Sequence, residues 1–146
     1  MDYKRNCDCC GHQTTAFSHN LNAQLIQALD QLNDYYFKNH RGCNLQKNLN
    51  LTKNQYNNFQ KLQYFNLVTR VEDGWIPTIV GTKFLQGDIT VENPVATFGK
   101  EILNRYHEAW RTSERVPTLI HISQIRNYNW KGRKEYQGEK SQTLFK

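Results

Sequence analysis

The segment LTKNQYNNFQKLQYFNLVTRVEDGWIPTIVGTKFLQG, residues 51–87, holds the patterns that decide the fold. It opens with Thr52 and, three residues later, Gln55, a capping-box pair whose side chains bond the free backbone N–H groups at a helix start. We therefore expect a helix from about Lys53. The apolar residues expected on its buried face are Tyr56, Phe59, Leu62 and Phe65.

The second half of this segment predicts a β-hairpin. Residues 67–79, LVTRVEDGWIPTI, alternate in polarity around Asp73-Gly74. Asp-Gly is a strong signal for a two-residue hairpin loop, and a type I′ turn with positive φ at both residues is expected there. Pro77 lacks a backbone N–H donor, which confines the second strand to an edge.

Residues 19–50 predict two earlier helices. Apolar side chains recur at steps of three and four, so an amphipathic helix is expected from about Asn20 to Lys38. Gly42 is expected to end this period, and Leu45 and Leu49 indicate a short second helix. The periodic residues are Leu21, Leu25, Ala28, Leu29, Leu32 and Tyr36.

The order helix, short helix, capped helix and hairpin resembles the winged helix-turn-helix domains of bacterial transcription regulators, over roughly residues 20–87. Those families often have a Leu-x-x-x-x-Leu helix end, a two-stranded wing, and a Thr-x-x-Gly-x-x-Phe-Leu segment that starts the next helix. Here Asn66 stands where glycine is common, and Pro77 where leucine is common. The matching residues are Leu62, Leu67, Asp73-Gly74, Thr78, Gly81, Phe84 and Leu85. The resemblance implies an α+β fold of three helices plus a wing, and double-stranded DNA as partner.

Beyond this unit the chain changes character. PTLIHISQI, residues 117–125, has the β-branched density of a strand, and Gly99-Lys100 is a candidate hairpin turn. We therefore divide the chain into four parts. They are an N-terminal metal knuckle (1–19), a winged-helix domain (20–87), a β-rich extension (88–125) and a basic tail (126–146).

The stretch NCDCCGHQTTAFSH, residues 6–19, suggests a structural zinc site. Cys7 and Cys10 form a C-x-x-C pair followed by Gly11, which resembles a zinc knuckle, because two thiolates at this spacing can hold one tetrahedral ion. No H-x-E or H-E-x-x-H pattern accompanies the pair, which argues against a catalytic metal. The absence of a βαβ pattern argues against redox chemistry, and free cysteines remain the alternative.

Two further ligands are needed, and several residues compete. We choose His19 as the third ligand, with His12 as its rival, and His107 as a fourth ligand from the C-terminal half, with Cys9 also open. The pair His40 and Cys43 is set aside, because a helix of about 19 residues at ~1.5 Å per residue would place it about 28 Å from the helix start.

The polar face of the third helix and the tail predict a nucleic-acid surface. Asparagine can bond adenine in bidentate fashion, and lysine can bind phosphate or guanine. Six Lys or Arg and two Glu between residues 126 and 146 give a net +4 of the chain's total of +6, and tail aromatics could stack on bases. The same residues would suit an ordinary solvated surface. The candidate residues are Lys53, Asn54, Asn57, Asn58, Lys61, Arg70, Lys131, Arg133 and Lys134.

Other function classes receive little support. No nucleophile with a neighbouring base, glycine-rich phosphate loop or carboxylate pair stands out, so an enzyme is not expected. No apolar run is long enough for a membrane span and no signal-peptide core is present, so a soluble cytoplasmic protein is expected. Two hypotheses remain: a DNA-binding transcription regulator of phage or bacterial origin, and a small phage or mobile-element protein that modulates a host protein complex through the same fold.

Overall fold

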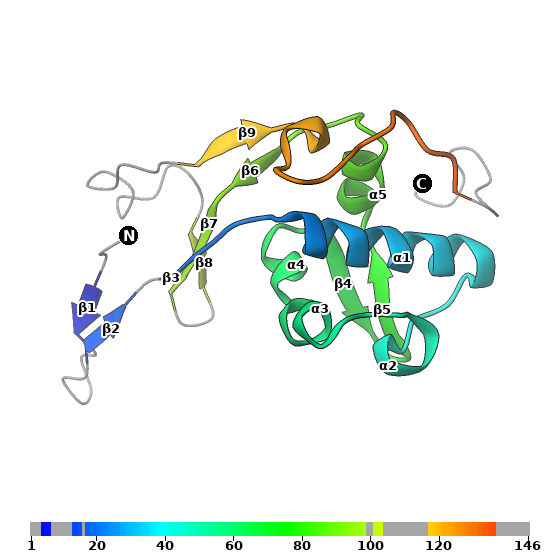
Figure 1. Cartoon of the computed structure of the whole chain (residues 1–146). Helices are drawn as coiled ribbons and strands as arrows, with labels where there is room; N and C mark the ends of the chain where they lie inside the picture. The colour runs from blue at the N-terminus through cyan, green and yellow to red at the C-terminus, as the bar shows by residue number, and fades with distance from the viewer. Residues whose placement is uncertain (1–3, 7–12, 16, 99–100, 104–116, 137–146) are drawn as a thin grey trace.

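The computed structural model describes residues 4–6, 13–15, 17–98, 101–103 and 117–136. These residues form an α+β fold in which helices pack around a hairpin and small antiparallel sheets lie to one side (Figure 1). The α+β class predicted from the sequence is confirmed. None of the helices in this part of the chain is long and apolar enough to cross a membrane.

Helix α1 spans Ala23–Asn39, within one to three residues of the expected bounds. The Asn22 side chain caps its start by accepting a hydrogen bond from the Leu25 N–H at 2.9 Å. His40, in the left-handed region at φ 54°, ends the helix and donates its N–H to the Tyr36 carbonyl. The expectation that Gly42 ends the helix is therefore wrong. Gly42 is needed elsewhere, because a Cβ there would lie 2.3 Å from Oδ1 of Asp73 on the hairpin turn.

The short helix α2 spans Leu45–Asn48, and the capped helix α3 spans Lys53–Asn58. The predicted capping box is confirmed, since the Thr52 and Gln55 side chains bond each other's backbone N–H groups. The helix expected to continue to Phe65 instead breaks into α3 and α4, Lys61–Tyr64. Between them the hydrogen bonds tighten to a three-residue step, as in the Leu62 N–H to Phe59 carbonyl bond of 3.0 Å.

The expected buried face of α3 is wrong at one position. Tyr56 is 42% exposed, and Gln55 is buried at 5% exposed. Gln55 can be buried because both ends of its amide are hydrogen bonded. The oxygen accepts from the Thr52 N–H, and the nitrogen donates to the Gln24 carbonyl of α1 at 3.0 Å. Phe59, Leu62 and Phe65 are buried as predicted.

Strands β4 (Val68–Val71) and β5 (Gly74–Pro77) form the predicted hairpin, with a different turn. Val71 pairs with Gly74, so the two loop residues are Glu72 and Asp73. Neither has a positive φ, which rules out the type I′ turn expected at Asp73-Gly74. Gly74 begins β5 at φ 142°, where a Cβ would lie 2.4 Å from the Cys43 carbonyl oxygen.

The other edge of β5 bonds the chain just before α2. Cys43 and Trp75 exchange two backbone hydrogen bonds of 2.8 and 3.0 Å. The glycine is thus required by this close approach of two backbones, and not by the hairpin loop. This bridge ties the hairpin to the loop between α1 and α2.

Helix α5, Ile79–Leu85, follows the hairpin directly. Thr78 caps it by accepting from the Gly81 N–H, as the Thr-x-x-Gly segment predicts for a helix start. At Gly81 the helix touches the backbone before β4, because a Cβ there would lie 2.1 Å from the Leu67 carbonyl oxygen. Asn66 adopts the left-handed conformation at φ 62°, which asparagine and glycine reach more readily than other residues.

The remaining strands form three small antiparallel sheets. Strands β1 (Lys4–Asn6) and β2 (Gln13–Thr15) pair with each other, and β6 (Val91–Asn93) pairs with β9 (Thr118–Ile120). The third sheet has the order β3 (Phe17–His19), β7 (Val95–Phe98), β8 (Glu101–Leu103). Phe98 pairs with Glu101, so β7 and β8 flank the expected turn at 99–100, which itself lies outside the described residues. A short 3-10 helix, Ile122–Gln124, follows β9.

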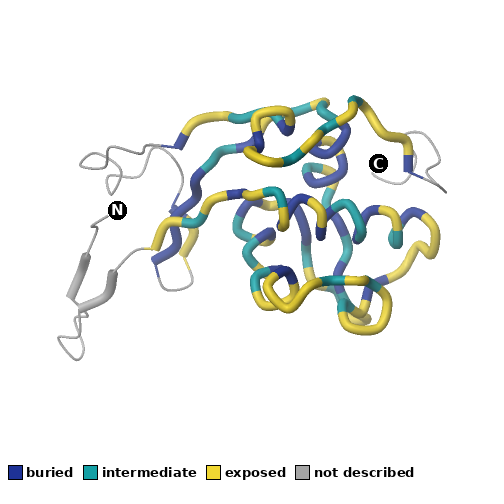
Figure 2. Tube along the Cα trace, in the orientation of Figure 1, coloured by how far each residue is buried: buried dark blue, intermediate teal, exposed yellow. Residues whose placement is uncertain are grey.

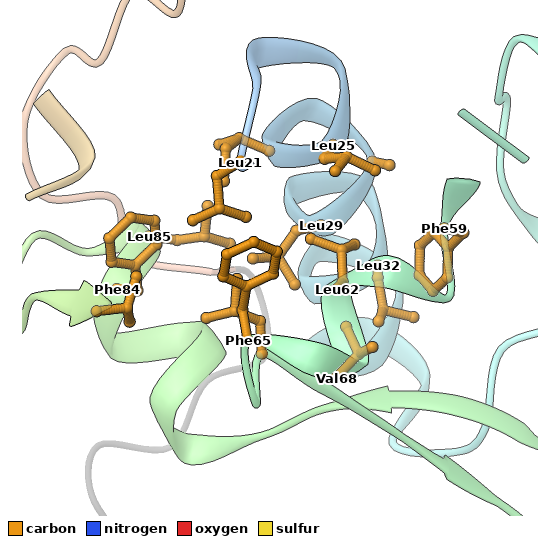
Figure 3. Close-up of a cluster of buried hydrophobic side chains, with 14 of the residues drawn as sticks. Leu21, Leu25, Leu29, Leu32, Phe59, Leu62, Phe65, Val68, Phe84 and Leu85 are labelled. Atoms are coloured by element: carbon orange, nitrogen blue, oxygen red, sulfur yellow. The ribbon is translucent and has the colours of Figure 1, made fainter. Parts of the chain in front are cut away.

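One hydrophobic core joins α1, the α3–α4 region, the hairpin and α5. Figure 3 shows side chains from α1, the α3–α4 region, β4 and α5 converging on one cluster. Leu29, Leu32 and Leu62 are fully buried there. Asn33, also fully buried, is satisfied by bonds to the Leu29 carbonyl and to the Thr82 hydroxyl of α5. This core fixes α3 and the hairpin relative to α1.

Candidate nucleic-acid interface

Four exposed side chains line the side of α3 and its following turn that faces away from the core. Lys53, Tyr56, Asn57 and Gln60 are spaced i, i+3, i+4 and i+7, which places them on one face of a helix. Phe59 and Gln60 keep right-handed helical dihedrals, so this face continues past the end of α3. We call these four residues the α3 outer face. Figure 2 shows exposed residues along the turns around α2 and α3.

Two of the predicted asparagines lie off this face. The Asn54 amide donates to Oε1 of Gln24 on α1 at 2.8 Å, and the Asn58 amide donates to Oδ1 of Asn54 at 2.9 Å. The first bond anchors α3 to α1, and the second holds Asn58 within α3. Asn57 is exposed and has no side-chain hydrogen bond within the described part of the chain. Lys61, at the start of α4, is half-buried.

The hairpin places Arg70 near the α3 outer face. Arg70 is exposed, and its guanidinium carbon lies 5.5 Å from the ring centroid of Trp75, its cross-strand partner. A groove of about 330 Å³ separates the hairpin from α2 and α3. It is lined by Cys43, Asn44, Leu45, Gln46, Tyr56, Arg70, Glu72, Asp73, Gly74 and Trp75.

The groove carries both signs of charge. Glu72 and Asp73 lie on the hairpin turn beside Arg70, and Oδ2 of Asp73 accepts a hydrogen bond from the Gly42 N–H at 3.3 Å. Lys47 on α2 and Lys53 on α3 are exposed nearby. The surface formed by α2, α3 and the hairpin is therefore only moderately basic.

The three tail cations predicted for this surface, Lys131, Arg133 and Lys134, do not join it. Arg133 forms ion pairs with Asp88 and Glu135, and Lys134 forms ion pairs with Asp30 at 3.2 Å and Asp34 at 3.0 Å. Burial opposes the charge on Lys134, but the two carboxylates outweigh it and raise the pKa of that amine. Lys131 is exposed, while Arg133 and Lys134 are already paired with carboxylates.

Aromatic residues hold this part of the tail, residues 126–136, against α1 and α5. Tyr136 is buried, stacks on Phe37 at a centroid distance of 5.6 Å, and donates its hydroxyl to Oδ1 of Asp30 at 3.0 Å. The Trp130 indole N–H donates to the Leu85 carbonyl at 3.1 Å.

The segment thus lies on the opposite side of α1 from α3 (Figure 1). Within the described residues, the third helix, the hairpin and the tail do not form the single surface that the sequence predicted.

The proposed zinc ligands fall mostly outside the described residues. Cys7, Cys10 and His107 lie there, as do the rivals Cys9 and His12. The described strands on either side of segment 7–12 pair with each other, Asn6 opposite Gln13. Within the described part of the chain, no group of three or more His, Cys, Asp or Glu side chains could hold a metal ion.

His19 is described and has other partners. It lies on β3, its Nε2 is 2.9 Å from the Thr97 hydroxyl of β7, and its ring centroid is 5.0 Å from that of Tyr64. Burial, followed by the charge of Lys61, lowers the pKa of the imidazole and favours its neutral form. A neutral imidazole is the form that binds zinc, but the nitrogen bonded to Thr97 is already used.

Sequence reasoning missed Tyr56 and Gln60 as surface residues. Tyr56 was assigned to the core because its spacing places it on the same helix face as Phe59 and Leu62. No local signal could have found it, because the exposure of Tyr56 accompanies the burial of Gln55, whose amide bonds the Gln24 carbonyl of α1. Lys47 was also missed, since the short second helix has too few residues to show a periodic face.

Comparisons with protein-family models, with curated proteins and with solved structures found no match. The chemistry of the surface formed by α2, α3 and the hairpin is therefore the basis for assigning a function.

Proposed function

We propose that this chain is a winged-helix protein that binds double-stranded DNA, with α3 in the major groove and the β4–β5 hairpin as the wing. The observation that carries the proposal is the α3 outer face, four exposed side chains beside a hairpin that presents Arg70. Polar side chains on one helix face can reach base edges, and neighbouring cations can contact phosphates. A role in transcription regulation follows as part of this proposal.

The framework around α3 supports the assignment. α1 holds α3 through the Gln24 bonds, and α5 abuts the Leu67 backbone at Gly81. A reading helix must be held rigidly, because base contacts depend on positions within fractions of an ångström. The Cys43–Trp75 backbone bonds fix the hairpin in the same way.

An electrophoretic mobility series against genomic fragments, run at two salt concentrations, tests the proposal. A DNA-binding regulator retards a preferred fragment, and its affinity falls steeply with salt because bound cations release phosphate counterions. Tyr56→Ala and Asn57→Ala should weaken this binding, while Asn129→Ala, an exposed amide on the other side of α1, should not. Absence of retardation at low salt would contradict the proposal.

A protein partner is the second candidate function, and one observation favours it. The groove beside the hairpin brings Arg70, Glu72 and the exposed Tyr56 together, a mixed-charge and aromatic surface typical of protein interfaces. If one host protein is retained by the full chain in a pull-down and is released by Tyr56→Ala, and no DNA is bound, this alternative becomes the better proposal.

A further inference from the structure

We propose that the α3 outer face selects A·T base pairs in the major groove, with Asn57 bonding adenine and Tyr56 contacting the methyl group of thymine. This inference rests on the proposed function and names the DNA chemistry that the same interface would read. Each step depends on side chains that are exposed and held by a described framework.

Asn57 has the hydrogen-bonding pattern that adenine requires. Its amide offers one donor and one acceptor side by side, which match N7 and the N6 amino group of adenine in the major groove. Within the described residues the Asn57 side chain has no competing hydrogen bond, whereas Asn54 and Asn58 are held by α1 and by each other. Asn57 is therefore the asparagine of this helix that remains available for a base edge.

Tyr56 supplies the complementary apolar contact. It is 42% exposed next to a core in which Phe59 is 1% exposed, so its ring is directed away from that core. Thymine is the base that displays a methyl group in the major groove, and an apolar side chain is its usual partner. Adjacent residues on one helix thus match the two major-groove features that distinguish an A·T pair.

The rest of the face lacks the side chain best suited to guanine. Arginine reads guanine by donating to both N7 and O6, and no arginine lies on the described α3 outer face. Arg70 belongs to the hairpin and rests on Trp75. Lys53, at the first residue of α3, is the one cation of this face, and Gln60 at its far end has the same donor and acceptor pattern as Asn57.

The test begins with the full chain and a pool of random 20-base-pair duplexes. Duplexes retained by the protein should contain a run of A·T pairs. In the best of them, each adenine of the run is then replaced by 7-deazaadenine, which lacks N7, or each thymine by uracil, which lacks the methyl group. Affinity is measured by fluorescence anisotropy at one fixed salt concentration. At one or more positions each analogue should weaken binding, roughly fivefold for loss of the single hydrogen bond to N7.

Variants connect each base atom to its residue. Asn57→Ala should no longer respond to 7-deazaadenine but should still respond to uracil, and Tyr56→Ala should show the reverse. Asn129→Ala should respond to both analogues as the unaltered chain does. If duplexes bind with no A·T preference, with G·C preferred, or without response of the unaltered chain to either analogue, the inference is overturned while DNA binding stands. If no duplex binds, the proposed function itself fails.

Discussion

Gly81 is the residue at which α5 contacts the backbone between α4 and β4. A methyl group there would approach the Leu67 carbonyl oxygen to 2.1 Å, so the helix or the strand must move. Overpacking of this kind costs about 1–3 kcal/mol. We expect Gly81→Ala to lower the free energy of unfolding by that amount in urea titrations. The exposed Lys83→Ala on the same helix is the control, expected to change it by less than about 0.5 kcal/mol. Equal stability of the two variants would contradict the close contact.

A second prediction at the scale of single residues concerns His19, whose titration should make the free energy of unfolding depend on pH. Burial and Lys61 lower the pKa of its imidazole in the folded chain, so the unfolded chain binds the proton more readily. The stability contributed by neutral His19 is therefore complete above the ordinary pKa of 6.5 and is lost as pH falls through the lower folded value. Unfolding in urea between pH 7.5 and 5 should show this loss, and His19→Gln should reduce it. If the unfolding free energy of His19→Gln depends on pH in the same way as that of the unaltered chain, the prediction is contradicted.

At the scale of elements, the sequence predicted what depends on local patterns. The capping box at Thr52 and Gln55 and the amphipathic α1 were found from patterns of nearby side chains, and the helix start near Thr78 from the resemblance to winged-helix sequences. Asp73-Gly74 misled the turn assignment because Gly74 serves a distant contact with Cys43. The exposure of Tyr56 could not be predicted either, since it follows from the bond between Gln55 and Gln24.

We predict that the segment between β1 and β2 binds a metal ion. Asn6 and Gln13 pair, so the C-x-x-C pair lies between two hydrogen-bonded strands, and its spacing suits one tetrahedral zinc ion. We expect close to one equivalent of zinc per chain by elemental analysis of reduced protein. Cys7→Ser should release the metal and lower the melting temperature, because metal binding is coupled to folding. Cys43→Ser is the control for metal content, since Cys43 is buried against β5. Less than half an equivalent would exclude the site.

At the scale of the whole molecule, the tail changes the expected distribution of charge. The sequence suggested that Lys131, Arg133 and Lys134 add to the cations of α3, because formal charge carries no information on pairing. In the structure, two of these cations are paired on the far side of α1. Arg133 pairs with Asp88 and Glu135, and Lys134 pairs with Asp30 and Asp34. Three of these carboxylates, Asp30, Asp34 and Asp88, are distant in sequence, so the fold determines which cations are paired. Near the hairpin, Arg41 bonds the Tyr35 hydroxyl and interacts with Asp73. The cations left for phosphates near α3 and the hairpin are then Lys47, Lys53, Lys61 and Arg70.

This distribution predicts the salt dependence of DNA binding. Each phosphate neutralised contributes about −0.9 to the slope of log affinity against log salt concentration, so four interface cations give at most about −3.6. Adding the three tail cations would give about −6. We expect the smaller slope in anisotropy titrations across several salt concentrations, because Arg133 and Lys134 would have to leave their carboxylates to bind phosphate.

Variants at two sites distinguish an interface limited to α2, α3 and the hairpin from one that also includes the tail. Lys47→Gln or Arg70→Gln should each reduce the slope by about 0.9, whereas Arg133→Gln combined with Lys134→Gln should leave it unchanged. The tail variant loses ion pairs to Asp30 and Asp88, so its unfolding is measured first and the titrations are run where it is fully folded. If the tail variant lowers the slope by nearly 2, the tail leaves α1 to bind DNA. The interface would then extend beyond the surface formed by α2, α3 and the hairpin.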